Sequence, residues 1–204
     1  MNTPTGTPAA LVAAARQLFA RHGYAGASVR AITRLARANL GAVTYHFGSK
    51  AALYDAALAS ITDPFRERLA RAAATDEPAL DRIERVVRAV FEYLHEQPDF
   101  GRFIPQVMVR GRKVPGPVRR TMEANHGLIA GLIAQGQREG TIRRGDPRLM
   151  ALSVGAQPFF LTLMQAALQR AVAIDQSQPA VRERLVRSVI EFIRAGLAAR
   201  QEGS

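Results

Sequence analysis

Residues 28–50, with the sequence SVRAITRLARANLGAVTYHFGSK, constrain the fold of this chain more than any other segment. Apolar residues recur there at the spacing of one helix face, first at Val29, Ile32 and Leu35 and then at Leu40, Val43 and Phe47. Ser28 and Asn39 stand where the two short helices need N-caps. Such short helices bury little apolar area, so a third must close the core, and residues 9–22 can form it. The segment therefore predicts a helix-turn-helix unit.

The second short helix of this unit has an outward face with few long side chains. Its members are Gly41, Ala42, Thr44, Tyr45 and His46. In a helix-turn-helix the second helix is the one that enters the major groove of DNA. Val43 and Phe47 are assigned to the core because they share the inward face.

The charge distribution supports a surface for a polyanion. Residues 1–50 contain no Asp or Glu but six basic residues: Arg16, Arg21, Arg30, Arg34, Arg37 and Lys50. The whole chain carries a formal net charge of +11. An arginine-rich composition alone would make every helix basic, but it would not remove the acidic residues from one segment. We therefore expect nucleic-acid binding by the first quarter of the chain.

Composition limits the other possibilities. The chain has no cysteine, which excludes disulfides, thiolate metal sites and a cysteine nucleophile. Its N-terminus lacks a signal-peptide pattern, and no apolar run reaches the length of a membrane span. We expect a soluble, cytoplasmic protein without a cofactor.

Residues 51–204 predict further helices and no sheet, because no window alternates with the period of a strand. Glycine, proline and aspartate separate the helical segments. Residues 50–69 predict one long helix that Pro64 should kink or split. The segment from Leu149 to Ala173 is apolar nearly all round, so it must be covered on more than one side.

We predict that the last two helices pair with those of a second copy in a four-helix bundle. The residues assigned to this homodimer interface are Leu152, Ala156, Phe160, Leu163, Val186, Val189, Ile190, Ile193 and Leu197.

Residues 18–58, LFARHGYAGASVRAITRLARANLGAVTYHFGSKAALYDAAL, resemble the TetR family of bacterial transcriptional regulators, with an AcrR-like helix-turn-helix. Shared features include the aromatic-Ala-x-x-Gly-Tyr end of the first helix and the Ser-Lys-x-x-Leu start of the fourth. Residues 70–204 resemble the family in length, helix number and an apolar penultimate helix. The resemblance implies an all-α fold of about nine helices, a DNA-binding domain at 1–50 with its motif at about 28–47, and an effector-binding and dimerisation domain at 51–204. It also implies a dimeric repressor of a palindromic operator, released by a small effector.

The predicted DNA contacts are Ser28, Arg30, Thr33, Arg37, Asn39, Leu40, Gly41, Ala42, Thr44, Tyr45, His46 and Lys50. Lys50, Tyr45 and His46 are expected to bind phosphates, and the resemblance gives them that role. Ser28 is assigned equally to phosphate binding and to N-capping. The first residues of the recognition helix and Thr44 are left for the base edges, with Arg30 or Thr33 as helpers.

Arg37 departs from the family pattern, which usually places Gly in the turn between the two short helices. A left-handed arginine would cost on the order of 1 kcal/mol relative to glycine. We expect a helical, unstrained turn; the alternative is strain offset by a phosphate contact.

A family member would hold its effector among the later helices, and the apolar side chains there favour a hydrophobic or aromatic molecule. The candidate ligand residues are Phe65, Phe91, Phe103, Met108, Met122, Asn125, His126, Phe159, Phe160, Thr162 and Gln165. For any single one of them, ordinary core or dimer packing is the stronger interpretation. The histidines lack ligand spacing, so no metal site is predicted.

Two other functions compete with a specific regulator. An all-α enzyme is disfavoured because the sequence has no nucleophile–base pair, phosphate loop or paired carboxylates of recognisable spacing. A non-specific nucleic-acid-binding or architectural protein would share the basic segment, but its affinity would depend little on DNA sequence.

Overall fold

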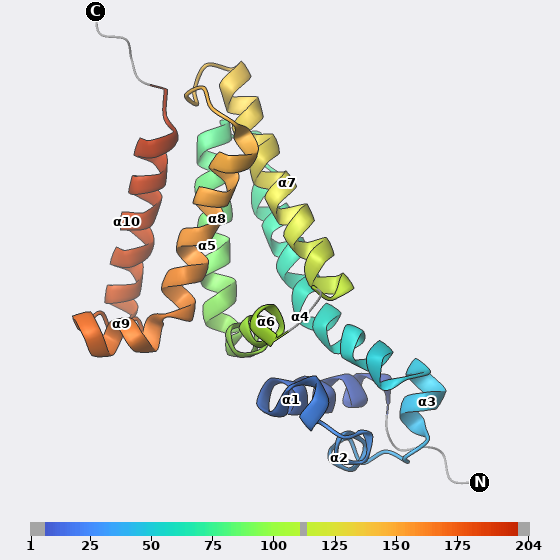
Figure 1. Cartoon of the computed structure of the whole chain (residues 1–204). Helices are drawn as coiled ribbons and strands as arrows, with labels where there is room; N and C mark the ends of the chain where they lie inside the picture. Colours follow the sequence, from blue (N-terminus) through green and yellow to red (C-terminus); the bar gives the residue numbers. More distant parts are fainter. Residues whose placement is uncertain (1–6, 111–113, 200–204) are drawn as a thin grey trace, which may run out of the picture. The chain divides into compact units, whose positions relative to one another are not determined.

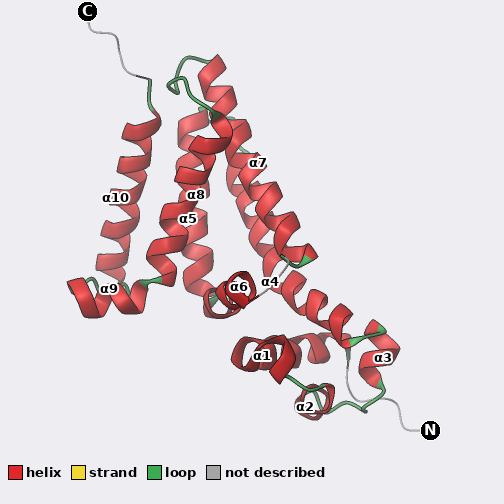
Figure 2. Ribbon diagram, in the orientation of Figure 1, coloured by secondary structure: helices red, strands yellow, loops and turns green. Residues whose placement is uncertain are grey.

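The computed structural model describes residues 7–110 and 114–199, and these residues form helices joined by short loops (Figures 1 and 2). In chain order the helices are α1 (Pro8–Gly26), α2 (Val29–Leu35), α3 (Ala42–Phe47), α4 (Lys50–Ala73), α5 (Ala79–Glu96), α6 (Pro98–Arg110), α7 (Gly116–Arg138), α8 (Pro147–Leu163), α9 (Gln165–Val172) and α10 (Pro179–Leu197). No strand occurs in the described ranges, so the all-α prediction is confirmed. The described residues form ten helices rather than about nine, because the segment predicted from Leu149 to Ala173 breaks at Met164.

The helices pack in two compact units. Residues 1–64 and 97–121 form unit 1, and residues 65–96 and 122–204 form unit 2. Helix α6 therefore packs with the N-terminal helices, although 50 residues (48–97) separate it from the end of α3 along the chain. The functional division at residue 50 stays a prediction, since these units describe packing alone.

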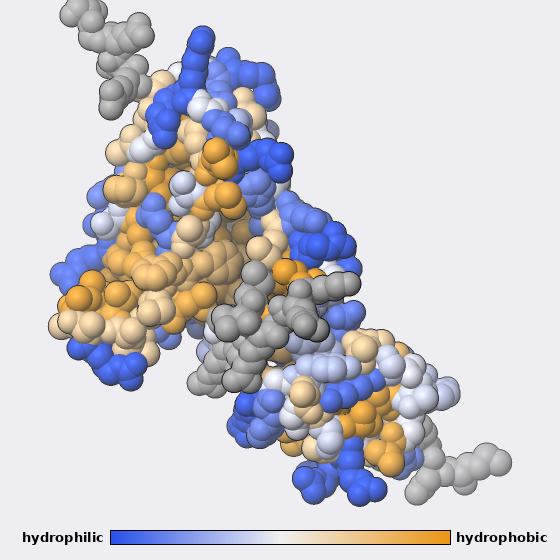
Figure 3. All heavy atoms as spheres, viewed as in Figure 1, coloured by the Kyte–Doolittle hydropathy of each residue, from blue (hydrophilic) through white to orange (hydrophobic). Residues whose placement is uncertain are grey.

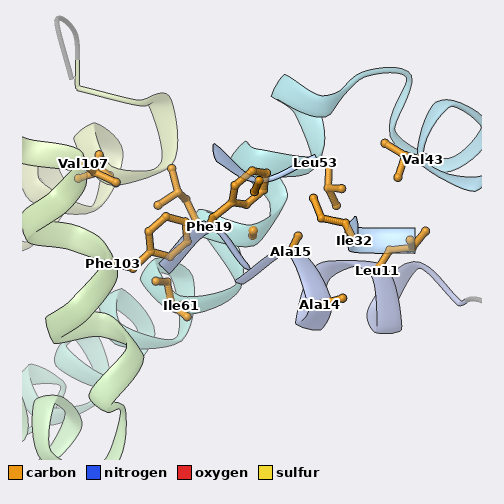
Figure 4. Close-up of a cluster of buried hydrophobic side chains, with 14 of the residues drawn as sticks. Leu11, Ala14, Ala15, Phe19, Ile32, Val43, Leu53, Ile61, Phe103 and Val107 are labelled. Atoms are coloured by element: carbon orange, nitrogen blue, oxygen red, sulfur yellow. The ribbon is translucent and has the colours of Figure 1, made fainter. Parts of the chain in front are cut away.

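An apolar cluster that joins residues of α1, α2, α3, α4 and α6 holds unit 1 together (Figure 4). Leu11, Ala15 and Phe19 of α1 are fully buried, and Ile32 of α2 lies among them. Phe103 of α6 is 1% exposed and lies 6.4 Å from the Phe19 ring, centroid to centroid. The two short helices thus obtain their core from α1, α4 and α6.

Helix α1 is interrupted near its end by a glycine with a positive φ. Gly23 has φ 69° and ψ 177°, which breaks the regular helix within the span of α1. The chain turns there, and the Tyr24 ring stacks back on Phe19 at 6.0 Å. Ser28 then caps α2 by accepting a hydrogen bond from the Ala31 amide at 3.1 Å. The Ser28 cap is as predicted, and the helix predicted at residues 9–22 continues past a kink at Gly23 to Gly26.

Pro64 was predicted either to kink or to split the helix that contains it. Helix α4 is not split there, since it runs from Lys50 to Ala73 with Pro64 inside it. Ser49 starts it by accepting a hydrogen bond from the Ala52 amide at 3.1 Å.

In unit 2, α5 is the central helix and packs against α8 and α10 (Figure 1). Its residues Ile83, Val86 and Val87 are almost fully buried. Arg194 of α10 forms ion pairs with Asp81 and Glu84 of α5 along the edge of this contact.

The side of α10 that faces α5 carries the residues that we had assigned to the dimer interface. Val186, Val189, Ile190, Ile193 and Leu197 are each at most 8% exposed within the single chain. They are core residues of unit 2, so their burial within one chain contradicts their assignment to the dimer interface. The 3.6-residue period marks an apolar face but does not say whether its cover belongs to the same chain.

The loop between α7 and α8 is tied to the end of α10. Ile142 and Ala198 form an isolated antiparallel bridge, with Arg143 N–H donating to the Leu197 carbonyl at 2.9 Å. Ile142 is 2% exposed and lies directly over Gly136 of α7. A side chain at Gly136 would meet the Ile142 Cδ1 atom at 2.5 Å, so this close approach depends on glycine.

Within the described residues, no single helix has both the length and the apolarity to cross a membrane. Helices α8 and α9, which meet at a 70° bend, reach those limits of length and composition only when joined.

The close contact between Gly136 and the Ile142 side chain gives a stability prediction, and Gly131 on the same helix gives its control. Gly136→Ala should lower the free energy of unfolding by about 1–3 kcal/mol, because Ile142 must move away. Gly131→Ala, on the same helix with no atom within 4 Å of the added carbon, should raise it by about 0.5–1 kcal/mol. Urea denaturation of the two variants measures both changes, and equal effects would contradict the packing at Gly136.

Candidate nucleic-acid interface

The recognition helix α3 contains only six residues, Ala42–Phe47, and its two faces differ sharply. Val43 is 1% exposed and Ala42 5%, so both belong to the core of unit 1. Tyr45 is 81% exposed and Thr44 is also exposed, while His46 is half-buried. The prediction of a DNA contact at Ala42 is therefore wrong, because the helix starts later than expected and Ala42 faces inward.

The residues before α3 form a turn rather than its first helical turn. The Ala42 amide donates to the Asn39 carbonyl at 3.0 Å, and the N-cap position is Gly41, with no side-chain cap. Asn39 is thus not the cap that we predicted. Leu40 is 55% exposed and does not continue the inward face of Val43. Asn39, Leu40 and Gly41 all lie in this turn and are exposed to solvent. A carbon added at Gly41 would have no atom within 4 Å.

Two of the predicted DNA contacts, Arg30 and Thr33, belong to helix α2, and only Arg30 is accessible. Arg30 is exposed. Thr33 is 3% exposed, and its hydroxyl donates to the carbonyls of Val29 and Arg30 at 3.1 and 3.2 Å. A hydroxyl committed to its own helix cannot read a base edge, so the prediction for Thr33 is wrong. Leu35, which was predicted on the same apolar face as Val29 and Ile32, is 47% exposed, so it is not part of the core.

Arg37 lies in the left-handed region, with φ 52°. The expectation of an unstrained helical turn is therefore wrong. The turn is closed by the Ala38 amide, which donates to the Thr33 carbonyl at 2.8 Å, and this bond ends α2. The chain reversal requires a positive φ at residue 37 whichever side chain stands there, and arginine bears the strain.

The basic side chains of unit 1 are not all alike. Arg16 is paired with Asp99 of α6 at 3.2 Å, so the acid-free first quarter receives one counter-charge through tertiary packing. Among the described residues, no ion pair involves Arg30, Arg34 or Arg37, and all three are exposed. Arg34 was missing from the predicted contacts, although it lies one helical turn after Arg30 on α2. The i, i+4 spacing of the two arginines was the signal for it.

Lys50 begins α4, and its ammonium lies over an aromatic ring. The Nζ atom is 4.6 Å from the centroid of the Tyr24 ring. Tyr24 in turn meets Tyr54 of α4 edge to face at 5.0 Å. Burial raises the pKa of the Tyr54 phenol, with the nearby Asp55 carboxylate adding to the shift, so this hydroxyl stays neutral at physiological pH.

The structure separates the candidate ligand residues into several groups. Phe65 and Phe91 are buried in unit 2, with the Phe65 ring 5.8 Å from Phe159. The Thr162 hydroxyl is buried without a hydrogen-bond partner in the described part of the chain. Asn125 is half-buried, as is His126, whose Nε2–H donates to the Arg148 carbonyl at 2.9 Å.

Other ligand candidates lie elsewhere. Phe103 belongs to the core of unit 1 and packs against Phe19 and Tyr54, so its assignment to the ligand site is wrong. Met122 and Phe160 are 50% and 59% exposed, and Gln165 is also exposed, because the faces of α7, α8 and α9 that carry them point outward. The side chain of Met108 lies outside the described residues.

One half of the predicted dimer surface is exposed in the single chain. Leu152, Phe160 and Leu163 of α8 are 58%, 59% and 41% exposed, and Ala156 lies between them. Phe192, on the outward side of α10, is 69% exposed. Figure 3 shows apolar side chains gathered on this part of unit 2.

Two family models match the chain. Residues 11–57 match the model described as "Bacterial regulatory proteins, tetR family", and residues 80–193 match "Tetracyclin repressor-like, C-terminal domain". The first match includes all of α2 and α3, and the second covers more than half of the chain.

Individual relatives agree with these models. The HTH-type transcriptional regulator RutR of Escherichia coli (strain K12) is 28% identical over 133 residues, which make up 63% of this chain and 62% of RutR. The crystal structure of FadR from Bacillus subtilis in complex with stearoyl-CoA has a TM-score of 0.75 at 18% identity, covering 93% of this chain and 99% of that one. AibR in complex with isovaleryl coenzyme A and operator DNA has a TM-score of 0.68 at 16% identity, covering 91% and 96%. These two structures show the shared fold.

Arg37 allows strain and charge to be tested separately. Arg37→Gly should raise the free energy of unfolding by about 1–2 kcal/mol, because glycine adopts the left-handed conformation freely. It should also weaken DNA binding and reduce the salt dependence of log K by about 0.9, the value for one phosphate contact. Arg37→Ala should share the loss of binding without the gain in stability. Denaturation and fluorescence anisotropy at several salt concentrations measure both effects, and an unchanged salt dependence would exclude a phosphate contact.

Proposed function

Because the chain belongs to the TetR family of bacterial regulatory proteins, we propose that it is a ligand-responsive DNA-binding transcriptional regulator. In this proposal a homodimer binds a palindromic operator, represses transcription and is released by a small apolar effector. The observation that carries it is the recognition helix, whose exposed residues stand beside arginines that have no ion-pair partner among the described residues.

The division of contacts follows from side-chain chemistry. Arg30, Arg34 and Arg37 suit phosphates, which hold a protein in register on the duplex without reading its sequence. Asn39 and Thr44 can reach base edges, since an amide pairs with adenine and a hydroxyl or methyl suits several bases. Leu40 adds an apolar contact for a thymine methyl group. Tyr45, His46 and Ser28 carry polar groups that suit phosphate oxygens, and the Ser28 hydroxyl can still donate while its oxygen caps α2.

A homodimer is supported by the exposed apolar stripe on α8. Leu152, Ala156, Phe160 and Leu163 recur every three or four residues, so they share one helix face. Together with Phe192 of α10 they form more exposed apolar surface than scattered single residues would give. A dimer that binds a palindrome presents its two copies of α3 to half-sites about 34–36 Å apart.

An apolar effector is supported by the interior of unit 2. Phe65 and Phe91 are buried there and Phe159 is half-buried, and the Thr162 hydroxyl is buried without a hydrogen-bond partner among the described residues. Acyl thioesters are a reasonable first class to test, because FadR and AibR were crystallised with stearoyl-CoA and isovaleryl coenzyme A. An effector that prefers a dimer with a different separation of its α3 helices would release the DNA.

Footprinting on the DNA that flanks the coding region of this protein tests the proposal. A single protected palindrome, bound far more tightly than unrelated DNA, is the expected result. Uniform affinity for all duplexes would favour a non-specific architectural protein instead. Calorimetric binding to the protected site with and without candidate effectors then tests release, and unchanged affinity with an effector that binds the protein would contradict it.

Two substitutions distinguish residues that contact phosphates from residues that contact base edges. Lys50→Ala should weaken binding to every duplex and lower the salt slope by about 1, because it removes a phosphate contact. Thr44→Ala should change the preference at one base pair of the protected site. Anisotropy on a set of single-base variants of that site measures both, and a uniform loss for the two proteins would contradict the division of roles.

The dimer surface has its own test. Leu152→Glu should raise the dimer dissociation constant by about two orders of magnitude, because two unpaired carboxylates would be buried in the interface. Val114→Glu serves as the control, since Val114 is an exposed apolar residue of unit 1. Sedimentation velocity over a concentration series measures both, and equal behaviour of the two variants would place the interface elsewhere.

A further inference from the structure

We infer that Tyr24 is a positioning residue for DNA binding: its ring holds the Lys50 ammonium at the start of α4, ready for a phosphate. The Lys50 Nζ lies 4.6 Å from the ring centroid, within the range of about 6 Å for a cation–π contact. Tyr24 is 43% exposed, so the site opens to solvent. This inference rests on the proposed function.

The ring is fixed by groups other than Lys50. After the break at Gly23, Tyr24 stacks on Phe19 with an interplanar angle of 18°, and it meets the edge of Tyr54 at 5.0 Å. Phe19 is fully buried and contacts Tyr54 at 4.9 Å. The orientation of Tyr24 therefore comes from the core of unit 1, and the lysine adapts to it.

The Tyr24 ring stabilises the Lys50 ammonium at an unfavourable position. It occupies the first turn of α4, where the helix macrodipole is positive and disfavours a cation. No ion pair with a carboxylate involves Lys50 in the described residues. The negative face of the Tyr24 ring offsets part of that unfavourable field and restricts the lysine rotamers.

The N-terminal turn of α4 is suited to bind a phosphate when the Lys50 ammonium is held beside it. The Ala52 amide is already bound by the Ser49 hydroxyl at 3.1 Å. The amides of Lys50 and Ala51 belong to the helix start, where N–H groups have no partner within the helix. A phosphate can accept from these amides and from the ammonium together, while the ring stays on the opposite side of the ammonium.

A double-mutant cycle tests the role of Tyr24. The variants are Tyr24→Leu, Tyr24→Phe and Lys50→Met, and the probes are the footprinted duplex and an unrelated duplex of the same length. Tyr24→Leu should weaken binding to both duplexes about two- to five-fold, the size of an exposed cation–π contact. Tyr24→Phe keeps the ring and should bind like the wild type. In the Lys50→Met background, Tyr24→Leu should have no further effect.

Each contrary result has a distinct meaning. Equal losses in the two Lys50 backgrounds would show a structural role for Tyr24 and overturn the inference. Tighter binding by Tyr24→Leu would show that the ring sequesters Lys50, which also overturns it. If the wild type binds neither duplex at low salt, the proposed function itself fails.

A measurement on the wild-type protein makes the test independent of the folding of Tyr24→Leu. The chain contains two lysines, Lys50 and Lys113, so selective ¹³C labelling gives two ε-methylene signals in an NMR spectrum. The Lys50 signal should be shifted upfield by the ring and should stay so when either duplex is added. Loss of that shift on DNA binding would show that the ring releases Lys50, and would contradict the inference.

Discussion

The helix-turn-helix of this protein depends on apolar packing that its own two helices cannot provide. Helices of seven and six residues are too short to be stable alone, because nucleation costs more than so few backbone hydrogen bonds return. Their stability comes from a cluster in which Ile32 and Val43 meet residues of α1, α4 and α6. Phe103 of α6 belongs to that cluster, and its contacts with Phe19 and Tyr54 make α6 part of unit 1.

The packing also explains where the unit tolerates unfavourable local chemistry. Arg37 bears a positive φ in the turn, and Lys50 stands at the positive end of a helix dipole. Both cations lie at the surface that we propose for DNA, while Arg16, on α1, is neutralised by Asp99. Residues that break a local rule are expected to cluster at functional sites, where the rest of the structure holds them in place.

Much of the proposed interface could be predicted because helical periodicity separates inward from outward residues. Val43 and Phe47 were placed inward, and Thr44 and Tyr45 outward, as the structure has them. The errors at Ala42 and Leu40 have one cause. The helix begins at Ala42, two residues after Leu40. The helical period therefore does not predict which way the residues at or before its start face. Thr33 was misassigned because a threonine can satisfy its hydroxyl within its own helix.

The sequence by itself determined the all-α fold, the helix-turn-helix and the acid-free basic segment, since these follow from local spacing, capping residues and charge. Tertiary structure alone decided the partners of each apolar face. A period of 3.6 residues marks the buried stripe of α10 and the exposed stripe of α8 alike. Both helices pack on α5, but α8 buries a different face, which carries Met150, Ala151 and Val154. It also decided that α6 joins unit 1 and that the Tyr24 ring meets Lys50, because contacts between residues far apart in the chain leave no local signal.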